Sequence, residues 1–138
     1  MDSLKEKVLG MLPESPFIRY LGIEIIELDE EHARGRMPFT DRYKNPYGTM
    51  HGGCLYALAD TVAGTLANMS GEAVTTVEGG IHFLEPAADT DYVYCDAKMK
   101  RSGKHLITVE VELKDDAGKL LDCGCLSFFR TGYKLDKD

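Results

Sequence analysis

Apolar residues recur at helical spacing near the start of the chain and then fall into two extended runs. The helical spacing predicts a short amphipathic helix over residues 4–11, which Pro13 and Pro16 end. The extended runs, Ile23–Leu28 and Ala33–Phe39, are joined by polar residues and predict a β-hairpin. We therefore expect the chain to begin with a helix followed by a pair of antiparallel strands.

A loop without periodicity, residues 41–50, leads into the most apolar part of the sequence. From His51 to about Met69 the residues are small or apolar on nearly every side, and Asp60 is the only charge. A helix that is apolar all round is a buried helix, and its small side chains allow a sheet to close around it. The pattern therefore predicts one long central helix.

The rest of the chain predicts four strands, separated by turns rich in Gly, Pro and Asp. Their ranges are 73–83, 91–100, 105–113 and 120–130. The last two connections have the composition of hairpin turns, so we expect a four-strand meander. Gly79 and Gly80 inside the first of these strands indicate a bulge or a close approach to the backbone. The order of hairpin, helix and meander predicts an α+β fold whose antiparallel sheet wraps a central helix.

Size and composition limit what else the chain can be. Its 138 residues suit a single domain over residues 1–138, of which 1–20 form the N-terminal helix and lead-in. The net charge of -7 opposes nucleic-acid binding. The sequence has neither a secretory signal nor an apolar run long enough to cross a bilayer. We therefore expect a cytoplasmic protein without a membrane partner, whose four cysteines are reduced thiols.

The segment from Asn45 to Asp60 contains the residues of a candidate active site. His51 stands where the loop becomes the helix, so we expect the amides of Gly52 and Gly53 to be unpaired donors of the first turn. The helix dipole adds partial positive charge at this end. Because glycines let a carbonyl group approach the backbone closely, these donors suit a developing oxyanion.

Asp60 is the second part of this site, because a lone carboxylate inside an apolar helix is costly unless a partner or a task holds it there. To act as a base or nucleophile at neutral pH it must stay ionised, which requires hydrogen-bond donors or positive charge nearby. His51 and Asp60 are about 13 Å apart along a helix, so one carbonyl group cannot contact both. We therefore expect a homo-oligomer, in which the His51 end of one helix faces Asp60 of another chain.

Asn45, the run His51-Gly52-Gly53 and Asp60 lie at the spacing of a family signature. Over nearly its whole length the chain resembles hotdog-fold thioesterases of the phenylacetate-degradation type. This resemblance implies hydrolysis of an acyl-CoA by a dimer or dimer of dimers, with coenzyme A as part of the substrate and no other cofactor. It implies that Gly52 donates its amide to the thioester oxygen, with Asn45 assisting and His51 beside the carbonyl. It also implies that Asp60 of the other subunit activates water or attacks the carbonyl carbon.

Two further groups of residues follow from the resemblance. Relatives place a Ser or Thr on the strand after the helix, near the carboxylate, and Thr76 matches that position. Glu78, two residues on, is a weaker candidate that we expect on the same face of the strand. Relatives also bind coenzyme A phosphates at the subunit surface, and the basic turn here resembles the one often used. Its expected phosphate-binding residues are Lys100, Arg101, Ser102, Gly103 and Lys104.

Each site residue also has a purely structural alternative. Asp60 could be a buried polar residue bonded to the backbone, and His51 could be a helix cap without chemistry. Asn45 could be an ordinary turn residue and Thr76 an ordinary strand residue. The basic turn could equally be a solvated hairpin tip. Cys54 is interpreted as a small buried helix residue, because no His or Asp is spaced to activate it.

Two other functions remain open beside thioester hydrolysis. One is a dehydratase or hydratase of the same fold acting on CoA or carrier-bound acyl groups. The other is a non-catalytic acyl-CoA-binding module, against which Asp60 counts. A metal site is not expected, because Cys123 and Cys125 lack a second pair of ligands at zinc-binding spacing.

Overall fold

The computed structural model describes residues 2–136, and its elements follow the predicted order. The helices are α1 (Asp2–Met11), α2 (Pro16–Leu21) and α3 (Gly52–Asn68), with short 3₁₀ turns at Leu12–Glu14 and Asp41–Tyr43. The strands are β1 (Glu24–Leu28), β2 (His32–Pro38), β3 (Glu72–Phe83), β4 (Tyr92–Ser102), β5 (Leu106–Lys114) and β6 (Leu120–Lys134). Each predicted helix and strand is present, with ends that shift by a few residues.

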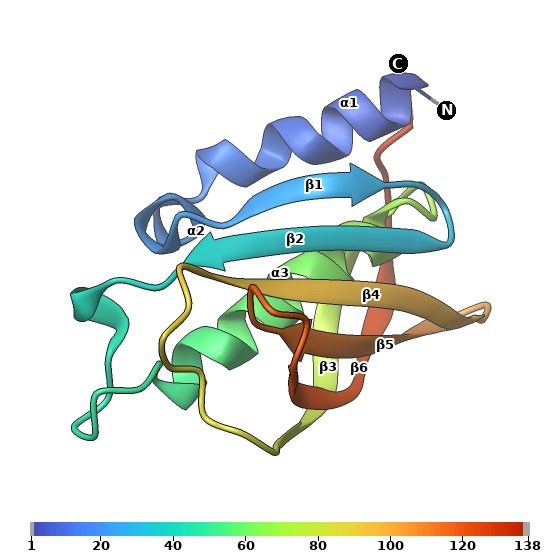
Figure 1. Cartoon of the computed structure of the whole chain (residues 1–138). Coiled ribbons are helices and arrows are strands. Elements are labelled where there is room, and N and C mark those ends of the chain that lie inside the picture. The colour runs from blue at the N-terminus through green and yellow to red at the C-terminus, as the bar shows by residue number, and fades with distance from the viewer. Residues whose placement is uncertain (1, 137–138) are drawn as a thin grey trace.

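Within residues 2–136 the strands form one antiparallel sheet in the order β1-β2-β4-β5-β6-β3. The sheet curls around α3, which lies along its concave face (Figure 1). An antiparallel sheet wrapped around a central helix is the predicted α+β hotdog fold, and this prediction is confirmed.

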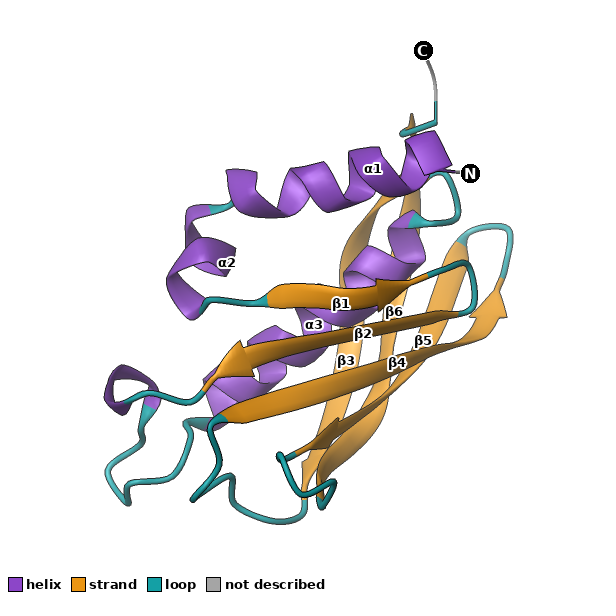
Figure 2. Cartoon of the chain, turned by 45° about the horizontal axis from the view of Figure 1, so that its top comes forward, coloured by secondary structure: helices purple, strands orange, loops and turns teal. Residues whose placement is uncertain are grey.

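The predicted four-strand meander is wrong in one pairing. Strands β4, β5 and β6 are consecutive neighbours, but β3 pairs with β6 and β4 pairs with β2. The reason is the connection at residues 84–91, which is too long for a hairpin turn and carries the chain to the opposite side of the meander. As a result β1 and β3 are the two edges of the sheet (Figure 2).

The core lies between the concave face of the sheet and α3. Leu58, Val62 and Leu66 of α3 are fully buried, as predicted for a central helix. Gly35 of β2 allows the close packing, because a Cβ at this position would lie only 2.6 Å from Cγ2 of Val62. None of the helices that the structure describes is both long and apolar enough to span a membrane.

The N-terminal lead-in contains a second helix that the sequence analysis missed. Pro16 does not only follow α1; it occupies the first position of α2, where its missing N–H costs nothing. Ser15 caps α2 by accepting a hydrogen bond from the Ile18 amide at 3.2 Å. In both views α1 lies alongside β1, on the same side as α3 (Figure 2). The Ser15-Pro16 pair was the available signal for this helix.

A β-bulge interrupts β3 between Thr76 and Glu78, where the register with β6 shifts. Close by, the hydroxyl of Tyr56 on α3 donates a hydrogen bond to the carbonyl of Gly79 at 3.0 Å. A Cβ on Gly79 would lie 2.1 Å from that hydroxyl, so only glycine fits without displacing the tyrosine. The sequence prediction of a bulge or close approach in this part of the strand is confirmed.

Candidate active site

His51 caps the N-terminus of α3, where its Nδ1 accepts a hydrogen bond from the amide of Gly53 at 2.8 Å. The prediction that two glycine amides are free is therefore wrong for Gly53. The amide of Gly52 finds no acceptor among residues 2–136. The first turn of α3 thus presents one free donor at the position that the sequence indicated.

The same cap determines which nitrogen of His51 carries its proton. Because Nδ1 accepts the Gly53 amide, the neutral imidazole must be protonated on Nε2. The Nε2–H group is then a second donor at the positive end of the α3 dipole, and the side chain is exposed. His51 is therefore a helix cap, as the structural alternative has it, and it keeps a donor available for a ligand.

Asn45 closes the loop that leads into α3. Its Oδ1 accepts hydrogen bonds from the amides of Tyr47 at 2.9 Å and Thr49 at 3.1 Å. Its Nδ2 donates to the Thr49 hydroxyl at 2.8 Å. These are the contacts of a turn-forming Asn, so only the second Nδ2–H remains for a substrate carbonyl.

Asn45 and Gly52 line one cavity, which we call the amide-side cavity. It has a volume of about 260 Å³ and lies between the loop, the start of α3 and the end of β3. Its apolar walls are formed by Met50, Leu55, Phe83, Leu84 and Pro86. The free amide of Gly52 therefore faces a space large enough for a small organic group.

Asp122 of β6 also lines the amide-side cavity, and the sequence analysis missed it. Its side chain is buried, and this burial raises the pKa of its carboxyl group to about 7. The available signal was a single acidic residue that follows Leu120 and Leu121 in a strand of mostly uncharged residues.

Asp60 contacts Thr76 across the gap between α3 and β3. The Thr76 hydroxyl donates a hydrogen bond to Oδ1 of Asp60 at 2.7 Å. Asp60 is partly exposed in the single chain, so the expectation of a deeply buried carboxylate is wrong. Strand β3, which carries Thr76, is an edge of the sheet, so among residues 2–136 no further strand lies beyond it to cover the pair.

Asp60 and Thr76 line a second cavity of about 260 Å³, which we call the carboxylate-side cavity. It follows one face of α3 through Thr61, Gly64 and Asn68. Apolar walls close it on the other sides; they consist of Val8, Met11, Leu12, Ile18, Val74 and Phe128. Four of these wall residues belong to the N-terminal lead-in, which no local sequence pattern connects to Asp60.

The two cavities share no lining residue. The helix separates Gly52 from Asp60 by about 12 Å, at 1.5 Å per residue. Within one chain, the free amide and the carboxylate therefore face different spaces. This is the geometry from which the sequence analysis expected a site shared between chains.

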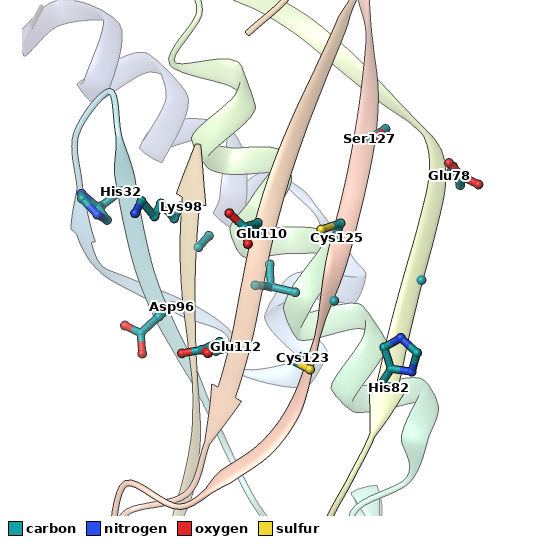
Figure 3. Close-up of a pocket in the computed structure, with 14 residues that line it drawn as sticks. His32, Glu78, His82, Asp96, Lys98, Glu110, Glu112, Cys123, Cys125 and Ser127 are labelled. Carbon is teal, nitrogen blue, oxygen red and sulfur yellow. The ribbon is translucent and has the colours of Figure 1, made fainter. Parts of the chain in front are cut away.

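Glu78 does not join Asp60 as the sequence analysis expected. Thr76 pairs with the buried Phe128, whereas Glu78 pairs with Ser127 on the outer face of the sheet. The bulge between them turns Glu78 to the side of the sheet opposite Thr76. There it lines an open groove of about 880 Å³ together with residues such as His82 and Cys123 (Figure 3). This large groove lies away from the residues of the candidate site.

The basic turn is the tip of the β4–β5 hairpin. Arg130 of β6 holds it by donating to the Gly103 carbonyl at 2.9 Å and to the Ser102 hydroxyl at 2.7 Å. Lys100 forms an ion pair with Glu110 on the neighbouring strand at 3.6 Å. Arg101 and Lys104 are exposed. Two of the five expected phosphate-binding residues are thus exposed cations without a partner among the described residues.

The sequence and the fold of the chain are similar to those of known proteins. The model of the thioesterase superfamily matches residues 47–121. The acyl-coenzyme A thioesterase PaaI of Escherichia coli is 32% identical over 99 residues, which are 72% of this chain and 71% of the relative. The proofreading thioesterase EntH of Cronobacter turicensis is 36% identical over 81 residues, 56% of each chain.

The chain belongs to the thioesterase superfamily. The structural similarity to a member of this superfamily extends over a larger part of the chain than the sequence similarity. The structure of the E. coli PaaI protein from the phenylacetic acid degradation operon superposes with a TM-score of 0.88 at 28% identity. The superposition covers 96% of this chain and 99% of the other. The predicted resemblance to thioesterases of the phenylacetate-degradation type is therefore confirmed.

The family model covers only part of the candidate site of this thioesterase. Residues 47–121 include His51, Gly52, Asp60 and Thr76, but neither the N-terminal walls of the carboxylate-side cavity nor Asp122. Cys54 lies inside the matched segment, yet burial raises the pKa of its thiol, which makes it a poor nucleophile. The carboxylate of Asp60 and the free amide of Gly52 are therefore the stronger candidates for the chemistry of this thioesterase.

Proposed function

We propose that this chain hydrolyses acyl-CoA thioesters at sites that two copies of it form together. The contact between Asp60 and the Thr76 hydroxyl carries the proposal, because it holds a partly exposed carboxylate in one orientation beside an apolar cavity. Membership of the thioesterase superfamily and the likeness to an acyl-coenzyme A thioesterase support hydrolysis over a dehydratase or hydratase reaction.

In the proposed reaction, the thioester oxygen accepts a hydrogen bond from the Gly52 amide, with the His51 Nε2–H as a second donor. Asp60 of the other chain takes a proton from water as the water oxygen attacks the carbonyl carbon, and it passes this proton to the thiolate as the C–S bond breaks. In the alternative route Asp60 attacks the carbon itself, the thiolate leaves, and a water then hydrolyses the acyl anhydride, its protons going to the thiolate and to solvent. The hydroxyl of Thr76 keeps the carboxylate in place throughout.

The free edge of β3 supports the two-chain arrangement. Among residues 2–136, strand β3 pairs only with β6, and its outward edge includes Val77, which is 53% exposed. Long unprotected edges of this kind readily pair with another chain. In the proposed dimer, two β3 edges joined antiparallel bring each α3 N-terminus toward the other chain's Asp60. Within a single chain, the two groups line separate cavities.

The two cavities fit the two halves of such a substrate. We place the acyl group in the carboxylate-side cavity, because its walls are mostly apolar and Asp60 stands at its edge. Phosphates of coenzyme A would bind at the basic turn, where Arg101 and Lys104 are exposed and Arg130 fixes the backbone. Such binding weakens as salt increases, because exposed charges are screened.

The proposed function is tested with a panel of acyl-CoAs, followed by the loss of thioester absorbance. This readout avoids thiol-trapping dyes, which would also react with the four native cysteines. We expect Asp60→Asn to lower turnover by about 10²–10⁴-fold while the fold is kept. The matched control is Glu78→Gln. It removes the Glu78 carboxylate from the outer face of the sheet, away from Asp60, and should leave turnover unchanged.

Two results would contradict the proposal. Wild-type rates in Asp60→Asn would remove the carboxylate from the reaction. Binding of acyl-CoA without any turnover by the wild-type protein would instead identify a non-catalytic binding module.

A further inference from the structure

Asp122 carries a buried carboxyl group that the reaction proposed above does not use. Its side chain is 0% exposed, and neither carboxyl oxygen has a hydrogen-bond partner among the described residues. Burying a polar group without a partner costs free energy, and native proteins leave few such groups. The fold alone therefore does not account for a carboxyl group at this position.

Asp122 lies next to the part of the site that binds the carbonyl group. It is the cross-strand neighbour of Phe83, and a Cβ on Gly52 would lie 3.6 Å from the Phe83 ring. One aromatic side chain thus connects the free amide of Gly52 with Asp122, and all three residues line the amide-side cavity. A ligand bound at Gly52 would pass this ring to reach the carboxyl group.

The surroundings of Asp122 contain no charge that would satisfy it. Its neighbour on β5 is Leu113, and beyond that lies Cys95 on β4, a thiol whose pKa burial also raises. Glu85 at the cavity edge forms an ion pair with Lys119 at 3.6 Å. No cation contacts the carboxyl oxygens within residues 2–136. Burial raises the pKa of the carboxyl group to about 7, so the group titrates near neutral pH.

We propose that the amide-side cavity binds the thiol half of the thioester and that the Asp122 carboxylate accepts a hydrogen bond from an amide N–H of that half. The assignment rests on the proposed function, which puts the acyl group in the other cavity and the carbonyl oxygen at Gly52. The pantetheine arm of a CoA thioester carries such N–H groups a few atoms from the sulfur. Both oxygens are buried in the free chain, so the contact requires the Asp122 side chain to rotate toward the ligand.

This contact changes the protonation of Asp122 in a defined direction. A hydrogen bond from an N–H donor stabilises the ionised carboxylate and lowers its pKa from about 7. At pH 7 the protein should therefore release a fraction of a proton for each ligand bound. A ligand group that accepted a hydrogen bond from the protonated acid would instead cause proton uptake.

The first experiment measures this proton release by calorimetry with the full chain. The probe is S-(2-oxohexyl)-CoA, a ketone that cannot be hydrolysed, bound at pH 7 in buffers of different ionisation enthalpy. We expect proton release from wild type and a smaller release or none from Asp122→Asn and Asp122→Leu. Protons contributed by other groups remain in both variants and are subtracted by the comparison.

The second experiment compares two hexanoyl thioesters that differ only in the N–H. One is the thioester of N-acetylcysteamine, and the other is the thioester of 5-mercaptopentan-2-one, in which CH₂ replaces N–H. We expect wild type to prefer the amide by about ten-fold in kcat/KM. Asp122→Asn, which keeps an acceptor oxygen, should retain part of this preference, and Asp122→Leu should lose it.

The possible outcomes separate this proposal from the proposed function. Active wild type and variants with the same amide preference and the same proton release would overturn the role of Asp122 alone. If the Asp122 substitutions changed only the ratio of kcat/KM between hexanoyl-CoA and 3-hydroxyhexanoyl-CoA, the proposal would be overturned too, because the cavity would then hold the acyl half. Proton release by a wild type that hydrolyses nothing would leave the contact standing and end the enzymatic assignment.

Discussion

Gly52 is the residue at which a single backbone N–H can be removed with little other change. It is the first residue of α3, where proline is tolerated, and His51 before it has φ -60° and ψ 134°, which suit a residue preceding proline. We expect Gly52→Pro to lower kcat/KM by about 10²–10³-fold, the usual effect of losing one oxyanion donor. The measurement is steady-state turnover, with circular dichroism as the check on folding.

Gly52→Ala is the matched control for this prediction. It keeps the N–H, and its Cβ would meet the Phe83 ring at 3.6 Å, an ordinary contact. We expect activity within a few-fold of wild type. If the proline variant is as active as the alanine variant, the Gly52 amide takes no part in the reaction.

Most residues of the candidate site could be predicted from the sequence, but not Asp122 and not every contact. The sequence identified Asp60 and Thr76, which the fold brings to hydrogen-bond distance. The prediction of a free amide was wrong for Gly53, because the side chain of His51 already accepts that amide's hydrogen bond. The prediction for Glu78 failed, because one bulged residue reverses which face a strand residue occupies.

At the scale of elements, β3 and β6 approach each other so closely that one glycine is required. A Cβ on Gly124 would lie 1.9 Å from the carbonyl oxygen of Gly80, whereas a Cβ on Gly80 would meet nothing within 4 Å. We therefore expect Gly124→Ala to lower the free energy of unfolding by about 3 kcal/mol, because backbone and not a side chain must move. Gly80→Ala should change it little.

Urea unfolding of both variants checks this prediction. Equal stability of the two would mean that the strands can separate at no cost.

The elements themselves were largely predictable from the sequence, but the pairing of the strands was not. Period and composition located the helices and strands, except the short α2, but they could not show that β3 pairs with β6, because pairing depends on where the long connection leads.

At the scale of the whole molecule, the proposal that each site needs two chains can be tested by mixing inactive variants. Neither Asp60→Asn nor Gly52→Pro should form a working site alone. A mixed dimer contains one intact site, made of Gly52 from the first variant and Asp60 from the second. Random pairing of equal amounts should therefore restore about a quarter of the wild-type activity.

The control replaces the Gly52→Pro chains by chains that carry both substitutions. These have no intact Asp60 to contribute, so mixing should restore nothing. A mixture of the single variants that stays inactive, while native mass spectrometry shows mixed dimers, would place the whole site within one chain.

The separation of the two cavities also affects how such a protein can diversify. No residue lines both of them, so substitutions that reshape one leave the walls of the other unchanged. Much of the wall beside Asp60 comes from the first 20 residues, outside the segment that the family model matches. In the proposed site, selectivity for one acyl group over another can therefore drift in the leading helices, while Gly52 and Asp60 stay within the segment that the family model matches.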